Sequence, residues 1–197
     1  MSIWDTVNSI LAPLLLFMLI WQAYILIFNK GVPNIRTAPA IRRRIIEILQ
    51  KEYKVHSEKN DKKFKIIDIG CGNGLFTREI AKALPEAEVI GLEWSKAAIE
   101  QAKIKSKAQK LTNTHYIRTD FYDYDLKDID AAVMYLTIYD MGRMGEKLKK
   151  ELKRNALVTC NRFKLSAGWE PEECLEIKTL YPHQKQLHIY RQKNFHS

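Results

Sequence analysis

The apolar residues of this chain are most concentrated in a single run near its N-terminus. Residues 10–28 (ILAPLLLFMLIWQAYILIF) form 19 consecutive positions with no charged side chain and one amide, Gln22. A helix of this length rises about 28 Å, which is close to the thickness of the hydrocarbon core of a bilayer. Buried helices of globular domains rarely stay uncharged for so long, so the pattern predicts a transmembrane anchor within residues 1–30.

The charges around this run argue against a cleaved leader and predict an orientation. A signal peptide begins with a positively charged segment, but Asp5 is the only charged side chain ahead of the run. Basic residues come after the run, at Lys30, Arg36, Arg42, Arg43 and Arg44. By the positive-inside rule this side faces the cytoplasm. We therefore expect a single-pass membrane protein with residues 31–197 on the cytoplasmic side.

Beyond residue 31, short apolar runs alternate with amphipathic segments. Runs rich in β-branched residues predict strands at 64–70, 88–92, 115–118, 130–136 and 156–161. Segments with helical periodicity predict helices at 38–53, 75–84, 96–107 and 144–154. Residues 176–180 and 186–191, on either side of a turn at Pro182, predict a closing hairpin. Strands that alternate with helices form right-handed βαβ units, so the chain predicts an α/β domain with a doubly wound, mainly parallel sheet.

Composition narrows the class of protein without fixing its partner. The chain is 46% hydrophobic and 28% charged, which excludes a disordered or collagen-like protein. It carries 32 Lys and Arg against 23 Asp and Glu, a net charge of +9 that suits nucleic acid, anionic lipid, an acidic protein or simple solubility. Three scattered cysteines, none in a Cys-x-x-Cys pair, are too few for a disulfide framework, and we expect no metal site.

The candidate chemistry begins where the first predicted strand ends. Asp68, Gly70, Gly72 and Gly74 form the pattern D-x-G-x-G-x-G between that strand and a predicted helix. Glycine lets the backbone turn tightly and approach a ligand, and ligands of open parallel sheets bind at the carboxyl ends of the strands. The dinucleotide pattern G-x-G-x-x-G fails because Leu75 occupies its third position, and the Walker pattern is absent. The loop is instead typical of S-adenosylmethionine-dependent methyltransferases of the seven-stranded class.

Two further carboxylates follow the next two predicted strands. Glu93 ends the second strand, where a carboxylate can accept hydrogen bonds from both hydroxyls of a ribose. Asp120 follows the third strand, where it can accept from an adenine amino group, and Trp94 or Phe121 can face the adenine ring. Together with Asp68, these residues predict an S-adenosylmethionine site that needs no metal.

The segment after the fourth predicted strand is the candidate acceptor site. It lacks the [DNS]-P-P-[YFW] motif of DNA and amide N-methyltransferases, so we do not expect nucleic acid as a partner. Tyr135 and Tyr139 offer aromatic walls and hydroxyls that can orient an amine, and a partly dry channel favours the neutral amine that attacks. Asp140 can attract the cationic amine or accept a proton through water. These three are the candidate catalytic residues, with ordinary strand packing as the alternative for the tyrosines.

Nearly the whole chain resembles a narrower family. The segments that carry the resemblance are the N-terminal run, VPNIRTAP, IIDIGCGNG, GLEWS, YLTIYDM, GEKLKKELKRNALVTCNRF and GWEP. In order and spacing they are similar to the ATP synthase c-subunit lysine methyltransferase family and its archaeal and bacterial relatives. The resemblance implies a Rossmann-like class I fold, S-adenosylmethionine as cofactor, and a lysine of a protein, including one embedded in a membrane, as the methyl acceptor. Relatives tend to carry Tyr-Leu-x-Pro after the fourth strand, whereas this chain has no Pro there.

Two alternatives to this function stay open. A methyltransferase acting on a small molecule or a lipid would also suit a site at a membrane surface. A binding module that kept the fold without the activity is disfavoured by the intact glycine loop and by Glu93. A smaller expectation concerns Thr37, which precedes the first predicted helix and is expected to cap it, with contact to the cofactor's carboxylate as the alternative.

Overall fold

A computed structural model describes residues 3–29, 36–59 and 61–193 of the chain. The chain divides into two compact units, residues 1–35 and residues 36–197. The second unit carries the sheet and every candidate site residue.

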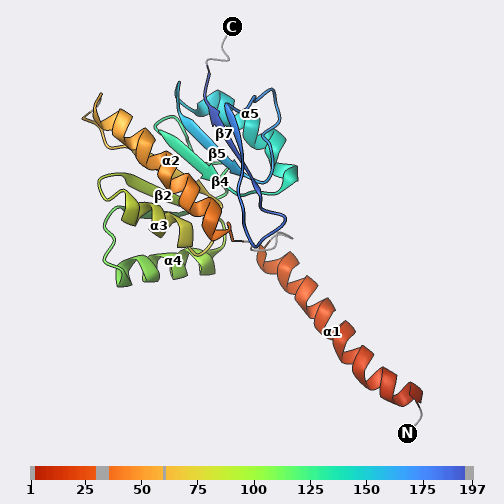
Figure 1. Ribbon diagram of the computed structural model, residues 1–197. Helices are drawn as coiled ribbons and strands as arrows, with labels where there is room; N and C mark the ends of the chain where they lie inside the picture. The colour runs from red at the N-terminus through yellow and green to blue at the C-terminus, as the bar shows by residue number, and fades with distance from the viewer. Residues whose placement is uncertain (1–2, 30–35, 60, 194–197) are drawn as a thin grey trace. The chain divides into compact units, whose positions relative to one another are not determined.

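The first unit holds one described helix, α1 (Ile3–Asn29), drawn in red in Figure 1. Its described side chains, those of Trp4 and of residues 7–23, are all exposed. Across the residues that the structure describes, no helix is long and apolar enough to cross a membrane. This finding does not support the predicted transmembrane helix, on which the prediction of the membrane as a partner rested. The side chains of residues 24–28, the end of the predicted run, lie outside the described part.

The second unit is built on one seven-stranded sheet with the order β3-β2-β1-β4-β5-β7-β6. Its parallel strands are β1 (Lys65–Ile69), β2 (Glu88–Glu93), β3 (Thr114–Arg118), β4 (Ala131–Met134) and β5 (Leu157–Asn161). Two antiparallel strands, β6 (Glu173–Glu176) and β7 (Gln186–Arg191), extend the sheet beyond β5. The order of strands reverses beside β1, where Asp68 pairs with Gly91 of β2 and Val133 of β4. The predicted doubly wound, mainly parallel sheet is confirmed, and its switch point, where ligands bind in such folds, lies at β1.

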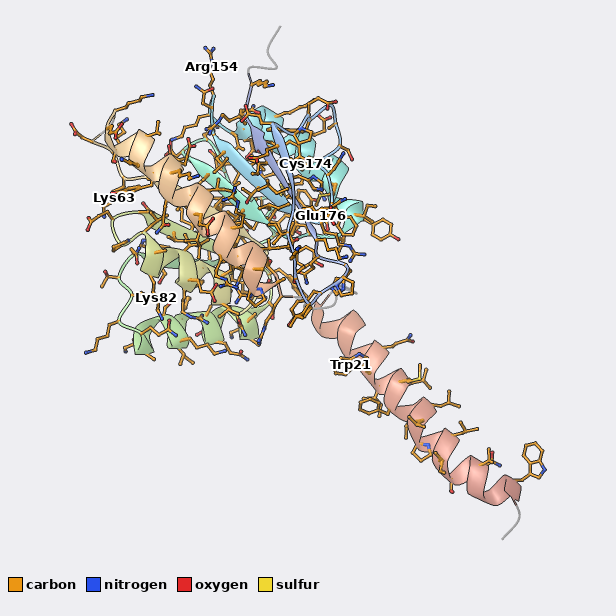
Figure 2. All side chains as sticks on the ribbon, viewed as in Figure 1. Trp21, Lys63, Lys82, Arg154, Cys174 and Glu176 are labelled. Carbon is orange, nitrogen blue, oxygen red and sulfur yellow. The ribbon has the colours of Figure 1, made fainter. Side chains whose placement is uncertain are left out.

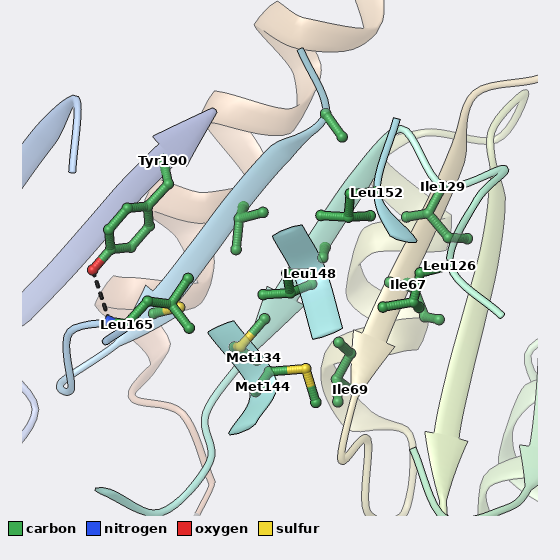
Figure 3. Packing of buried hydrophobic residues seen from close by; sticks show 14 of the residues in the cluster. Ile67, Ile69, Leu126, Ile129, Met134, Met144, Leu148, Leu152, Leu165 and Tyr190 are labelled. Atoms are coloured by element: carbon green, nitrogen blue, oxygen red, sulfur yellow. Dashed lines mark hydrogen bonds between the residues drawn. The ribbon is translucent and has the colours of Figure 1, made fainter. Parts of the chain in front are cut away.

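Helices cover both faces of this sheet. They are α2 (Pro39–Ser57), α3 (Leu75–Ala83), α4 (Lys96–Ala108) and α5 (Met141–Glu151). Because successive residues of a strand point to opposite faces, Ile66 and Ile67 of β1 enter different parts of the core. Ile66 belongs to a cluster with Ile45 of α2 and Ile80 of α3, while Ile67 belongs to a second cluster with Leu148 of α5. Figure 3 shows this second cluster.

Several element boundaries differ from the predictions, and burial explains two of the differences. Helix α5 begins three residues earlier than predicted, at the buried Met141, directly after a short 3₁₀ helix, η1 (Ile138–Asp140). Strand β6 also lies earlier than the predicted 176–180. Its register is set by the pairing of Leu175 with Leu187 of β7. In both cases the packing of one side chain against the core, rather than the local sequence pattern, decides where the element begins.

The predicted cap at Thr37 is wrong. The N-cap of α2 is Ala38, which makes no side-chain capping bond, and Pro39 follows at the first helical position. Proline suits that position because it has no N–H that needs a partner. Thr37 contributes its backbone carbonyl instead, which accepts a hydrogen bond from Arg42, and Arg42 also pairs with Glu79 of α3 at 2.6 Å.

Candidate active site

The loop between β1 and α3 has a left-handed backbone at three glycines. Gly70, Gly72 and Gly74 have φ angles of +76°, +54° and +70°. Residues with a Cβ rarely adopt this region. The N–H groups of Gly70 and Cys71 both donate to the carbonyl of Leu92, at 3.0 and 2.9 Å. The loop therefore crosses the carboxyl ends of β1 and β2, and the end of β2 holds it in place.

Gly74 and Gly70 are required for different reasons. A Cβ on Gly74 would lie 2.6 Å from the ring of Tyr116, so packing against β3 requires glycine there. A Cβ on Gly70 would lie 3.1 Å from Leu136, in the segment that follows β4. Gly70 is also exposed. It is therefore the position at which a side chain would fill the approach to the sheet edge.

Asp68 lies beneath this loop and is almost completely buried. Its carboxylate accepts a hydrogen bond of 2.7 Å from the hydroxyl of Thr77 on α3. Burial raises the pKa of Asp68 to about 6, the hydrogen bond from Thr77 opposes that rise, and the charge of Glu93 adds to it. Asp68 is therefore a carboxyl group that changes protonation near neutral pH.

Glu93 is held at the mouth of the same loop. One carboxylate oxygen accepts from the N–H of Gly72 at 3.2 Å, and the other accepts from the N–H of Ser95 at 2.9 Å. Each carboxylate oxygen can accept two hydrogen bonds. Both oxygens of Glu93 thus keep acceptor capacity for two hydroxyls, as the predicted ribose contact requires.

The predicted adenine-binding residues lie in and near the loop after β3. Asp120 accepts a hydrogen bond of 3.1 Å from the N–H of Tyr122 and is half-buried. The ring of Phe121 packs 4.7 Å from the ring of Tyr122, centre to centre. Trp94 is half-buried after β2, and its carbonyl accepts from Arg118 at 3.2 Å. The fold therefore brings Asp68, the glycines, Glu93 and this loop to one edge of the sheet, because parallel strands end together.

The three candidate catalytic residues occupy different environments. Tyr135 directly follows β4. Its hydroxyl is buried and has no hydrogen-bond partner in the part of the chain that is described. Tyr139 lies on η1 with 93% of its surface exposed. Asp140 accepts from the hydroxyl of Tyr122 at 3.1 Å and from that of Thr137 at 2.7 Å. Tyr135 thus has a buried hydroxyl without a partner, whereas Asp140 links the segment after β4 to the loop after β3.

Three residues of this edge were not predicted from the sequence. Thr77 hydrogen-bonds Asp68, and Tyr122 hydrogen-bonds Asp140. The guanidinium of Arg143 lies 3.7 Å from the centre of the Tyr122 ring. Burial, and then the charge of Asp140, raise the pKa of Tyr122, so its hydroxyl stays protonated and donates. These partners are far apart in sequence and form no local motif, so only the fold reveals them.

The strand order, the glycine loop after the central strand and the carboxylates at the ends of β1, β2 and β3 define a class I S-adenosylmethionine-dependent methyltransferase. The chain belongs to one family of this class: the ANTKMT methyltransferase domain matches residues 68–173, more than half of its length. That span includes every candidate site residue. Within the described residues, no group of three or more His, Cys, Asp or Glu side chains could hold a metal ion.

Known relatives and solved structures are consistent with this class. The chain is 38% identical over 89 residues to a carboxy-S-adenosyl-L-methionine synthase of Nautilia profundicola, covering 45% of this chain and 38% of that protein. It is 30% identical over 155 residues to a malonyl-[acyl-carrier protein] O-methyltransferase of Halalkalibacterium halodurans, covering 75% of this chain and 55% of that protein. The chain thus spans about half the length of these relatives, or less. An RNA methyltransferase of Salinibacter ruber, solved with S-adenosyl-L-homocysteine, shares the fold, with a TM-score of 0.67 and 15% identity over 80% of this chain and 93% of that one.

The cofactor of this protein is S-adenosylmethionine, and the residues at the edge fit it. The cofactor supplies a methyl group that is already electrophilic. Gly70 leaves open the space that a Cβ would fill, and Glu93 offers acceptors for a ribose diol. The carboxylates of Asp68 and Asp120 lie at the same edge, where they suit a ligand that carries an ammonium and a sulfonium.

Proposed function

We propose that this protein is a protein-lysine N-methyltransferase. Its membership of the ANTKMT methyltransferase family supports the proposal, as does the similarity of the segments around the site to lysine methyltransferases. The observation that carries the chemistry is the buried hydroxyl of Tyr135, which has no partner among the described residues. A buried hydroxyl without a partner is costly, and it calls for a polar group that arrives with the substrate.

A lysine amine can supply that group. Its reference pKa is about 10.4, so the amine must lose a proton before its nitrogen can attack. A buried channel favours the neutral amine because burial disfavours charge. By accepting one N–H of the amine, the hydroxyl of Tyr135 would hold the nitrogen lone pair in line with the methyl group. The nitrogen then gains the methyl group, whose bond to the cofactor's sulfur breaks, and the methylated ammonium releases one proton to water.

A second candidate is a methyltransferase that acts on a small molecule or a lipid. Two relatives favour it: the malonyl-[acyl-carrier protein] O-methyltransferase described above, and a ubiquinone biosynthesis O-methyltransferase of Pelagibacter ubique that is 30% identical over 120 residues. Both candidates use the same cofactor edge and differ only in the acceptor. Label from tritiated S-adenosylmethionine should therefore be followed separately into the protein and the organic-solvent fractions of an extract.

We expect the label in the protein fraction, with mass increments of one, two or three methyl groups on lysine by mass spectrometry. In the same assay Tyr135→Phe should lower kcat about tenfold and leave the affinity for S-adenosylmethionine within about twofold, because the hydroxyl aligns the amine without contacting the cofactor. Tyr181→Phe, on the exposed connection between β6 and β7, is the matched control and should keep the parental rate. Label confined to the solvent fraction would favour the second candidate, and a parental rate for Tyr135→Phe would remove Tyr135 from the acceptor site.

A further inference from the structure

A pocket lies at the opposite edge of the sheet from the glycine loop. It has a volume of about 800 Å³. Its walls come from the end of α2, the start of β1, the residues before β4 and the loop between α5 and β5. Because β1, β4 and β5 are parallel, their amino ends meet here while their carboxyl ends form the cofactor edge. The five residues of β1 separate the two edges by about 16 Å.

The charges that line this pocket are unbalanced. Its carboxylates are Glu52, Asp128 and Asp130, and its cations are Lys59, Lys62, Lys63, Lys65, Lys153 and Arg154. Each carboxylate has a partner: Glu52 pairs with Arg191 at 2.7 Å, Asp128 with Lys65 at 3.8 Å, and Asp130 with Lys153 at 2.5 Å. The remaining cations, Lys59, Lys62, Lys63 and Arg154, form no ion pair with any described residue. Asp61 lies in the same loop but does not line the pocket.

The two loops that carry these cations are fixed to the fold. The ring of His56 contacts the carbonyl of Lys62 at 2.9 Å, which holds the loop between α2 and β1. The buried carboxylate of Asp130 accepts from the N–H of Lys65 at 2.8 Å and pairs with Lys153 at the start of the second loop. Figure 2 labels Lys63 and Arg154, one on each loop, at the end of the domain where α2 ends. The unpaired cations thus converge from two anchored loops rather than from one solvated helix face.

We propose that this pocket binds a ligand with several phosphoryl groups, either a soluble oligophosphate or a phosphorylated lipid headgroup. Pockets for small ligands commonly measure about 300–1,000 Å³, so one compact ligand would fill this one. Phosphoryl oxygens accept charge-assisted hydrogen bonds from lysine, and arginine can bind two of them at once. The paired carboxylates on the walls oppose a weakly charged anion, so the ligand must carry several negative charges. It binds at an edge that the methyl transfer does not use.

The test is calorimetric titration of the full chain with sodium tripolyphosphate. Lys62→Glu and Arg154→Glu should each weaken binding about tenfold, because each reverses a charge at the pocket. Lys82→Glu is the matched control, since Lys82 is exposed on α3 and does not line the pocket, and it should change the affinity less than about twofold. All variants should bind S-adenosylmethionine as the parent does, which shows that they are folded.

Sedimentation with phosphatidylcholine vesicles, with and without phosphatidylinositol bisphosphate, distinguishes the two sources of phosphate. Binding to tripolyphosphate alone indicates a soluble ligand. Binding to the anionic vesicles that Arg154→Glu abolishes indicates a headgroup. The proposal is overturned if the parent binds neither probe, or if Lys82→Glu weakens binding as much as the pocket variants do.

Discussion

At the scale of single residues, we expect Asp68 to make the affinity for S-adenosylmethionine depend on pH. Burial raises its pKa to about 6, although Thr77 donates a hydrogen bond to it. A bound cofactor brings an ammonium and a sulfonium, and positive charge favours the ionised carboxylate. Binding below about pH 6 must therefore release the proton from Asp68. We expect the affinity for S-adenosylmethionine to rise as the pH increases through about 6.

Calorimetric titration between about pH 5 and about pH 7.5 measures this effect. Asp68→Asn should bind more weakly than the parent at the upper pH and should show no rise. Glu93→Ala is the control: it should lose about 1.5–3 kcal/mol of binding free energy from the ribose contact and keep the rise, moved to lower pH because the charge of Glu93 no longer raises the pKa of Asp68. An affinity of the parent that does not change with pH would contradict the role of Asp68.

At the scale of elements, one hydrogen bond joins the loop after β3 to the 3₁₀ helix after β4. Tyr122 stands beside the predicted adenine-binding residues, and Asp140 ends the acceptor segment. Tyr122→Phe removes this bond and keeps the ring that packs against Arg143. Because both elements lose a support, we expect the KM for S-adenosylmethionine and the KM for the acceptor to rise together, each by about two- to tenfold.

Thr137→Val separates this coupling from a local effect. Thr137 donates to the other oxygen of Asp140, but it lies in the same segment as Asp140. Its loss should therefore raise the KM for the acceptor and leave the KM for the cofactor unchanged. Steady-state kinetics with each substrate varied in turn decides the matter. If Tyr122→Phe changed only the KM for the acceptor, the two elements would be independent.

The elements also show which parts of the fold and of the site can be predicted from the sequence. Strand β1 and the glycine loop could be predicted because burial and glycine conformation are local demands that appear in the pattern itself. Glu93 and Asp120 followed from them, since parallel strands place their ends together. The start of α5 and the register of β6 could not be predicted, because Met141 and Leu175 are placed by distant partners. For the same reason, no pattern along the chain joins Tyr122 to Asp140.

At the scale of the whole molecule, the described core lies within the second unit. Both described core clusters take their members from residue 38 onward. Gln184, which is completely buried in the connection between β6 and β7, forms hydrogen bonds with the first residues of this unit. The amide oxygen of Gln184 accepts from the N–H of Ala38 at 2.7 Å and from Asn161 at 3.0 Å. Its nitrogen donates to the carbonyl of Arg36 at 3.0 Å.

This arrangement predicts different outcomes for two truncations that differ by three residues. A protein of residues 36–197 keeps every partner of Gln184, so its free energy of unfolding should lie within about 0.5 kcal/mol of the full chain, and it should bind S-adenosylmethionine normally. A protein of residues 39–197 loses the partners at Arg36 and Ala38 and leaves the buried amide nitrogen of Gln184 with only a long contact of 3.5 Å to His183, at a cost of about 1–3 kcal/mol. Urea unfolding followed by circular dichroism compares the three proteins. Equal stability of the two truncations would show that Gln184 does not fasten the start of the domain, and loss of folding in residues 36–197 would show that the first unit contributes to the core.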